Sequence, residues 1–202
     1  MSLKVQEGGD FKGVDAGTYP ARCIKVIDLG TQHGEYLGIP QVKKQVLITF
    51  ELPTELMESG EWAGSPYAIS KFYTASLGEK ATLRHDLEAW RGRPFTEEEL
   101  KGFDLKNVLG KPCMISVIKT ETGKSKINSV MAVMKGMTVP EAFNPFVFFD
   151  IDEWDSGIFT GLSDGIKKII LESDEGKERH NMAKEGIPTE DTQGCDDDKI
   201  PF

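Results

Sequence analysis

Only three of the 202 residues are cysteines, and Cys23, Cys113 and Cys195 lie far apart along the chain. An odd number at these spacings fits neither a disulfide framework nor the paired CxxC spacing of a structural zinc site. No apolar run approaches the roughly 20 residues that span a bilayer. The first residues, MSLKVQEGGDFKG, lack the basic and apolar regions of a secretory signal. These absences predict a soluble protein of the cytoplasm with no membrane partner.

The sequence also has little that indicates catalysis. Its three histidines have no metal-ligand spacing to one another or to the cysteines. The run Gly123-Lys124-Ser125 matches the end of a phosphate-binding loop, but the upstream glycine of that motif falls at Ile118. The acids of residues 150–155 (DIDEWD) are candidates for a divalent ion, yet Trp154 stands where a calcium loop needs Asp or Asn. We therefore expect that this protein is not an enzyme and that it binds neither a metal nor a cofactor.

The chain does have an excess of negative charge, and that excess is confined to one end. The formal net charge is -9. Residues 1–136 hold 18 Lys and Arg against 17 Asp and Glu, whereas residues 137–202 hold 6 against 16. Within the first part, residues 110–136 contain five lysines and one acid. These lysines either face phosphate groups or form the solvated surface of a hairpin.

Alternating apolar residues predict five strands. The pattern is strongest over residues 43–53 (KKQVLITFELP), and residues 19–29 and 67–73 are rich in β-forming side chains. Residues 112–119 and 127–134 return to the same period of two around a turn centred on Gly123. The order along the chain is therefore three strands, a different segment, and a hairpin.

Helical spacing marks the segment between the third and fourth strands. Ser76 and Glu79 have the spacing of a capping box, and so do Thr96 and Glu99. Three apolar residues follow the first pair at helical spacing: Leu83, Leu87 and Trp90. We expect a helix that ends near Arg91, with Trp90 in the core, and then a short helical segment.

This element order predicts a mainly β fold like the OB-fold, a five-stranded Greek-key barrel with one helix between strands 3 and 4. Periodicity alone does not exclude a ferredoxin-like or split sheet. The resulting domain covers residues 1–136.

Two further regions follow that domain. Residues 137–171 are rich in aromatic side chains and acids, and Ser163 precedes a short stretch with three isoleucines at helical spacing, so this extension is expected to pack on the barrel. From about Glu172 there is almost nothing apolar to bury, so residues 172–202 are predicted to be a disordered acidic tail.

OB-folds commonly bind oligonucleotides, and a single strand of DNA requires a cationic groove and rings on which bases stack. Phe72 and Tyr73 point to opposite faces of their strand, so one of them meets DNA. We favour Tyr73, which shares a face with Lys71, and place Phe72 in the core. Tyr36 and Trp62 either stack on bases or fold over the end of the barrel. The predicted DNA-binding residues are Arg22, Lys25, Tyr36, Lys43, Lys44, Lys71, Tyr73, Arg91, Arg93, Lys119, Lys124 and Lys126.

The last seven residues, DDDKIPF, form the most specific motif. They closely resemble the acidic tip, DDDIPF, of bacterial single-stranded DNA-binding proteins, apart from the inserted Lys199. The body, with its segments GTYPARCIKVIDLG, LEAWRGRPF and LGKPCMISVIK, resembles single-stranded DNA-binding replication proteins of bacteriophages over most of residues 14–136. The resemblance implies an OB-fold that coats single-stranded DNA in the host cell during replication, recombination and repair.

The tip itself has a chemistry that a partner can read. A terminal Phe places an aromatic ring and a free carboxylate on one residue, so a pocket with an apolar floor and a basic rim recognises both. The resemblance implies that such tips recruit replication and repair enzymes. The predicted partner-binding residues are Asp196, Asp197, Asp198, Ile200, Pro201 and Phe202.

Two other functions remain open. One is a metal-dependent nuclease or recombination factor that uses the acidic cluster, and the other is an adaptor that carries the tip without affinity for DNA. The sequence does not determine the oligomeric state, for which a homodimer is one arrangement. It also does not determine the choice between DNA and RNA.

The acidic tail leads to a first prediction. A flexible segment of 31 residues has a root-mean-square span of about 30 Å, so it reaches back across its own domain. Deleting Asp196 to Phe202 should abolish capture of tip-binding enzymes, and removing Phe202 alone should abolish most of it. DNA affinity should stay unchanged or rise slightly at low salt, where an acidic tail competes best for a basic groove. Pull-downs and oligonucleotide titrations measure the two effects, and equal capture by the full-length and Phe202-deleted chains would contradict the role of the tip.

Overall fold

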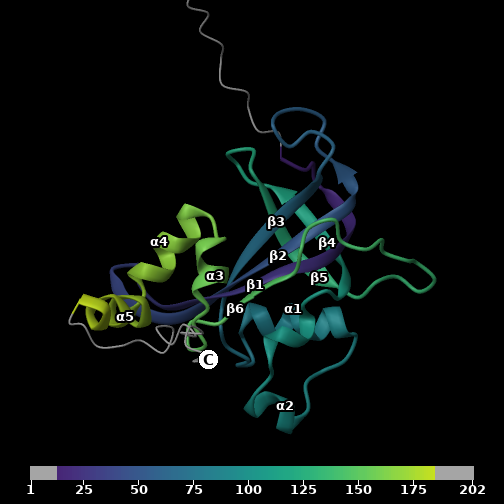
Figure 1. Ribbon diagram of the computed structural model, residues 1–202. Helices are drawn as coiled ribbons and strands as arrows, with labels where there is room; N and C mark the ends of the chain where they lie inside the picture. Colours follow the sequence, from purple (N-terminus) through teal and green to yellow (C-terminus); the bar gives the residue numbers. More distant parts are fainter. Residues whose placement is uncertain (1–12, 185–202) are drawn as a thin grey trace, which may run out of the picture.

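The computed structural model describes residues 13–184, and its main feature is a curled antiparallel sheet (Figure 1). The strands follow the spatial order β3-β2-β1-β4-β5, and a short sixth strand, β6 (Val147–Phe149), pairs parallel with β1. The other bounds are β1 Gly17–Tyr36, β2 Ile39–Leu56, β3 Pro66–Thr74, β4 Pro112–Lys119 and β5 Ser125–Met131. The mainly β prediction is confirmed, and β4 has the predicted bounds.

The first two strands are much longer than predicted. β1 and β2 form one hairpin that runs on past the body of the sheet toward α5 (Figure 1). Two irregularities bend β1, between Cys23 and Lys25 and between Asp28 and Gly30. Gly30 has a φ of 72°, a left-handed conformation that favours glycine. The polar sequence beyond Gly30 alternates too weakly to predict a strand, and pairing with β2 holds it in place.

The sheet curls until its two end strands meet. β3 and β5 are at opposite ends of the strand order, yet they are in contact. Lys71 of β3 crosses the gap, and its Nζ donates to the backbone oxygen of Asn128 of β5 at 2.9 Å. The strands thus enclose one core, and the β3–β5 junction is bridged here by a side chain.

The segment between β3 and β4 holds two helices and a 3₁₀ turn, where a helix and a short helical segment were predicted. These are α1 (Thr82–Arg91), α2 (Glu97–Lys101) and η1 (Leu105–Val108). The capping box at Thr96 and Glu99 is confirmed, because each side chain bonds the backbone of the other residue. The capping box predicted at Ser76 and Glu79 is wrong. Helix α1 begins after Ala81 without a side-chain cap, and the Ser76 hydroxyl accepts from the Gly78 amide instead.

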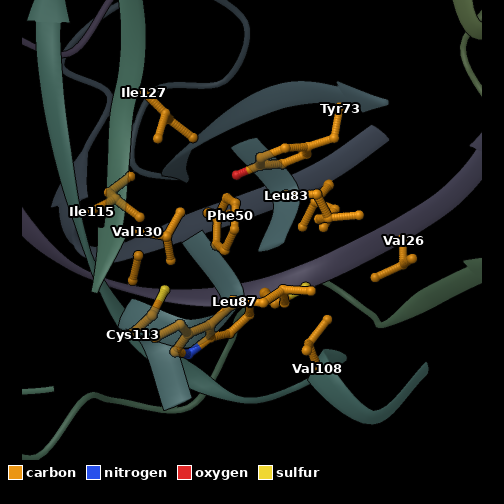
Figure 2. Close-up of a cluster of buried hydrophobic side chains, with 14 of the residues drawn as sticks. Val26, Phe50, Tyr73, Leu83, Leu87, Val108, Cys113, Ile115, Ile127 and Val130 are labelled. Atoms are coloured by element: carbon orange, nitrogen blue, oxygen red, sulfur yellow. The ribbon is translucent and has the colours of Figure 1, made fainter. Parts of the chain in front are cut away.

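Helix α1 closes the core on the inner face of the sheet (Figure 2). Leu83, Leu87 and Trp90 are buried, as the helical spacing predicts. The Trp90 ring lies 5.5 Å from that of Phe50, and its Nε1 donates to the Pro112 oxygen at 2.8 Å. The indole thus satisfies its one polar group while it fills part of the core between α1 and the sheet.

The chain after β5 builds a second core on the outer face of β1 and β2. Phe149 of β6 and Ile170 of α4 (Asp164–Glu172) pack there against residues of β1 and β2 such as Ile27 and Leu47. Helix α3 (Ser156–Thr160) adds further apolar residues. None of the helices within residues 13–184 combines the length and apolar character needed to cross a bilayer.

The predicted disorder from Glu172 is wrong for residues 172–184. A helix, α5 (Asp174–Lys184), continues from α4 and lies against the β1–β2 hairpin (Figure 1). The Glu175 carboxylate accepts from the Thr31 backbone amide and hydroxyl, each at 2.7 Å. These polar contacts explain why a segment with little to bury is helical here. The remainder of the predicted tail lies outside the described residues.

Two buried charges fasten residues 139–144, which we call the strap, to the outer face. Arg22 donates to the backbone oxygens of Val139 and Pro140, at 3.0 and 3.1 Å. Glu51 accepts from the backbone amides of Phe143 and Asn144, at 2.6 and 2.9 Å. Arg22 and Glu51 face each other across β1 and β2. Both ends of the strap are therefore anchored to neighbouring strands.

The packing of α4 leads to a second prediction, on stability. Ile170→Ala should lower the free energy of unfolding by about 2–5 kcal/mol, because Ile170 is fully buried between the sheet and the helix. The adjacent and exposed Leu171 is a matched control, and Leu171→Ala should cost less than about 1 kcal/mol. Urea denaturation followed by circular dichroism measures both. If Ile170→Ala unfolds in two separate transitions, the extension is not part of the same cooperative unit.

Candidate nucleic-acid interface

One hollow that combines an aromatic ring with basic side chains lies beside β3. It has a volume of about 720 Å³ and is bounded by β3, the β3–α1 loop and the start of β5. Phe72, Lys80 and Lys126 all line it. Both lysines are exposed, and neither forms an ion pair with another residue of the 13–184 segment. Their charges are therefore available to a ligand.

The ring at this hollow is not the one that the sequence favoured. Phe72 is 54% exposed, whereas Tyr73 is 4% exposed and packs in the core beside Phe50 and Leu83 (Figure 2). The assignments of Phe72 to the core and Tyr73 to DNA are therefore both wrong. A signal for the correct faces was present. Phe72 shares its face with the small residues Ala68, Ser70 and Thr74, and Tyr73 shares its own with Tyr67 and Ile69.

A buried carboxylate determines which way β3 faces. Asp86 of α1 accepts from Lys71 Nζ at 2.7 Å and from the Tyr73 hydroxyl at 2.8 Å. Burial, followed by the charge of Asp86, raises the pKa of Tyr73 well above its ordinary value. The three side chains fix α1 to β3 from the inside. Lys71 consequently lines the hollow with its charge already paired, rather than free for phosphate.

A second hollow, of about 710 Å³, continues along β3 toward its start. It is bounded by residues 67–69 of β3, Gly13 and Val14, and the β4–β5 turn with the predicted Lys124. Lys124 is exposed and has no ion-pair partner among the described residues. The predicted Lys119 instead donates to Gly13 and Ser125, both at 3.2 Å. We call the two hollows together the β3 groove.

Four of the predicted DNA-binding cations serve the protein instead. Arg22 is buried and holds the strap. Lys44 pairs with Asp28 and Asp152, at 3.0 and 3.1 Å. The remaining two, Arg91 and Arg93, both pair with Glu99, whose pKa they lower to about 2 together with the bond from Thr96. Such long-range pairings have no local sequence pattern, so the sequence could not reveal them.

Two predicted residues lie on the β1–β2 hairpin, away from the β3 groove. Tyr36 is 64% exposed, next to the hairpin turn, and Lys43 is exposed on the returning strand. Neither of them lines the groove. Trp62, in the β2–β3 loop, is exposed as well. The alternative that Tyr36 and Trp62 fold over the barrel end is therefore wrong, and their stacking on bases stays a prediction.

The structure brings three acids together near the segment of residues 150–155. Ligand atoms of Asp28, Asp150 and Asp152 lie within 4.8 Å of one another. The ammonium group of Lys44 bridges two of these carboxylates. Burial raises the pKa of Asp28, which its bonds to Gly30 and Lys44 oppose. The cluster is thus partly neutralised by the protein's own cation.

The predicted partner-binding residues, Asp196, Asp197, Asp198, Ile200, Pro201 and Phe202, lie outside the described residues. In comparisons with known proteins, no protein-family model and no curated protein matches the chain.

The exchange of faces on β3 leads to a third prediction. Tyr73→Phe should lower the free energy of unfolding by about 1.5–3 kcal/mol, because it removes a hydrogen bond to the charged Asp86. Phe72→Ala should change it by only about 0.5 kcal/mol, as at other exposed positions. Urea denaturation of the two variants compares neighbouring residues on one strand. A loss of about 3–5 kcal/mol for Phe72→Ala, typical of a core Phe, would show that Phe72 is buried in solution.

Proposed function

We propose that this protein is an OB-fold, single-stranded DNA-binding protein of the bacteriophage type. The pairing scheme supports the fold assignment: β1 pairs with β2 and β4, β3 pairs with β2, β5 pairs with β4, and β3 contacts β5. This connectivity, with a helix between the third and fourth strands, is that of a five-stranded OB barrel. The resemblance of residues 14–136 to phage replication proteins points the same way.

The observation that carries the proposal is the exposed ring of Phe72 at a hollow with Lys80 and Lys126. An exposed ring on a rigid strand offers a flat face for a base, and unpaired lysines attract the phosphates on either side of that base. Lys124 extends the same charge along the groove. Strand 3 and the loop between strands 4 and 5 are also where OB-folds bind oligonucleotides.

The chemistry favours a single strand without sequence preference. A ring stacks only on a base that has left the double helix, because duplex bases already stack on their neighbours. Every base has an aromatic face, so stacking on Phe72 does not select a sequence. The contacts at the β3 groove thus fit a protein that covers and protects single strands in replication, recombination or repair.

The chain's acidic tip completes the proposal. Its ring, carboxylate and aspartates would recruit partner enzymes of the host or phage to the coated strand. This part rests on the sequence DDDKIPF.

A fourth prediction tests the groove. Phe72→Ala should weaken binding of an oligo-dT by about 5- to 150-fold, since stacking contributes about 1–3 kcal/mol per base. Lys80→Ala with Lys126→Ala should reduce the salt dependence instead. Each lost phosphate contact changes the slope of log K against log salt by about 0.7, so the slope should become shallower by about 1.4. Fluorescence anisotropy at several salt concentrations measures both quantities.

The control is Lys101→Ala, on α2 at the far end of the molecule from the β4–β5 turn (Figure 1). It should leave both the affinity and the salt slope unchanged. The same titrations with magnesium or a chelator test the nuclease alternative, because cleavage that depends on the metal would replace the binding proposal. If the full-length protein has no affinity for oligo-dT, the DNA-binding proposal fails and the adaptor function is the remaining alternative.

A further inference from the structure

The strap presents one aromatic ring to solvent in an unusual way. Glu51 is fully buried, and its carboxylate accepts three hydrogen bonds from the strap: two from the backbone of Phe143 and Asn144, and one from Asn144 Nδ2 at 2.6 Å. Burying a carboxylate is costly, and only such a complete set of donors offsets the cost. The backbone at Phe143 is therefore fixed. Its ring, however, is 74% exposed.

Arg22 secures the other end of the strap in the same manner. Its guanidinium donates to Val139, Pro140 and Gly110, and it pairs with Glu141. Arg22 and Glu51 are cross-strand neighbours, yet each places its hydrogen bonds on the strap. Two buried charges thus hold a segment that contributes little to the apolar core near Phe143. A fixed backbone below an exposed ring is what a preorganised contact requires.

Register places Glu51, which anchors the backbone of Phe143, on the same face of the sheet as Phe72. Glu51 pairs with Ala68 of β3, and Leu47 pairs with Phe72, so both pairs lie on the outer face. Phe72 follows Ala68 by four positions along β3, about 13 Å at the rise of a strand. On that face of β3, the exposed residues that precede Phe72 are small: Ala68 and Ser70.

Lys25 supplies a cation beside the strap. It pairs with Thr49 of β2, between the Arg22–Glu51 and Ile27–Leu47 pairs, which puts it on the outer face as well. Lys25 is half-buried and forms no ion pair within residues 13–184. The sequence predicted Lys25 as a DNA contact, and this placement gives it a neighbouring ring.

We propose that Phe143 is a second base-stacking residue and that Lys25 contacts a phosphate beside it. The single strand then runs from the β3 groove at Phe72 across the outer face of β3 and β2 to the strap. This inference rests on the proposed function and extends its binding surface to a segment beyond the barrel strands. Arg22 and Glu51 act as positioning residues, since they hold the strap and do not touch the nucleic acid.

The surroundings of Phe143 favour a base over an apolar protein surface. The neighbouring Phe146 ring lies against Gly110, close enough that an added Cβ there would sit 3.4 Å from it. The exposed floor between Phe143 and Phe72 is made of small side chains, and a lysine borders it. A flat floor with a ring at each end and a cation beside it suits stacked bases and phosphates.

Substitutions at Phe143 test the inference. Phe143→Ala should weaken oligo-dT binding by about 5- to 150-fold, as expected for one lost stacking contact. Phe143→Trp, made in a Trp62→Phe background that removes the exposed native indole, should keep the affinity of the Trp62→Phe parent chain. Its emission should be quenched when oligo-dT is added. Quenching reports stacking directly, which a loss of affinity alone does not.

Phe146→Ala is the matched control, because it removes another partly exposed ring three residues away. It should leave affinity nearly unchanged. Glu51→Gln should weaken binding less than Phe143→Ala does, and Phe143→Trp should rescue no affinity in the Glu51→Gln chain, since the strap is then loosened.

The outcomes separate this inference from the proposed function. If Phe72→Ala weakens binding but Phe143→Ala does not, or if the Phe143→Trp emission ignores DNA, the strap is not a stacking site and the groove stands. If the wild-type chain does not bind oligo-dT, the proposed function itself fails. If Phe143→Ala alters only self-association, measured by sedimentation, the ring is a contact between copies and the inference is overturned.

Discussion

The cross-strand pair Arg22 and Glu51 is the constraint on which the outer half of the molecule depends. Each charge lies on the outer face of the sheet, and each forms hydrogen bonds to the strap. The strap leads directly into β6, which pairs with β1 and begins the second core. These two charges therefore fix the path of the chain between β5 and β6.

Asp86 has the corresponding role on the inner face. It binds Lys71 and Tyr73 of β3 from within α1, and so it sets the orientation of that strand. Because neighbouring side chains on a strand alternate, a buried Tyr73 requires an exposed Phe72. The candidate stacking ring is thus exposed as a consequence of a buried ionic contact. The two buried networks together fix the rings that we propose for DNA, Phe72 and Phe143.

Charge divides the protein in a way that matches this arrangement. The free lysines of the β3 groove lie within the first 136 residues, and most of the acidic excess lies after residue 136. Within the described chain, many of the other cations are paired: Lys44, Arg91 and Arg93 each contact a carboxylate. The positions of the unpaired cations therefore identify the candidate DNA-binding surface better than the total charge of the chain does. A net charge of -9 is compatible with a basic groove for this reason.

The sequence by itself determined the central parts of five strands and the main helix, because a period of two or 3.6 follows from which side of an element is buried. It also determined the charge division and the tip DDDKIPF. The full length of β1 and β2 and the short β6 depend on pairing within the sheet. Periodicity separates the two faces of β3, but the contact with Asp86 decides which of them is buried. Likewise Arg22 bonds residues more than 100 positions away, and Glu175 of α5 bonds Thr31 of β1, 144 positions away. These features depend on the tertiary structure, because the partner of a charged side chain can be identified only when the fold has brought the two side chains together.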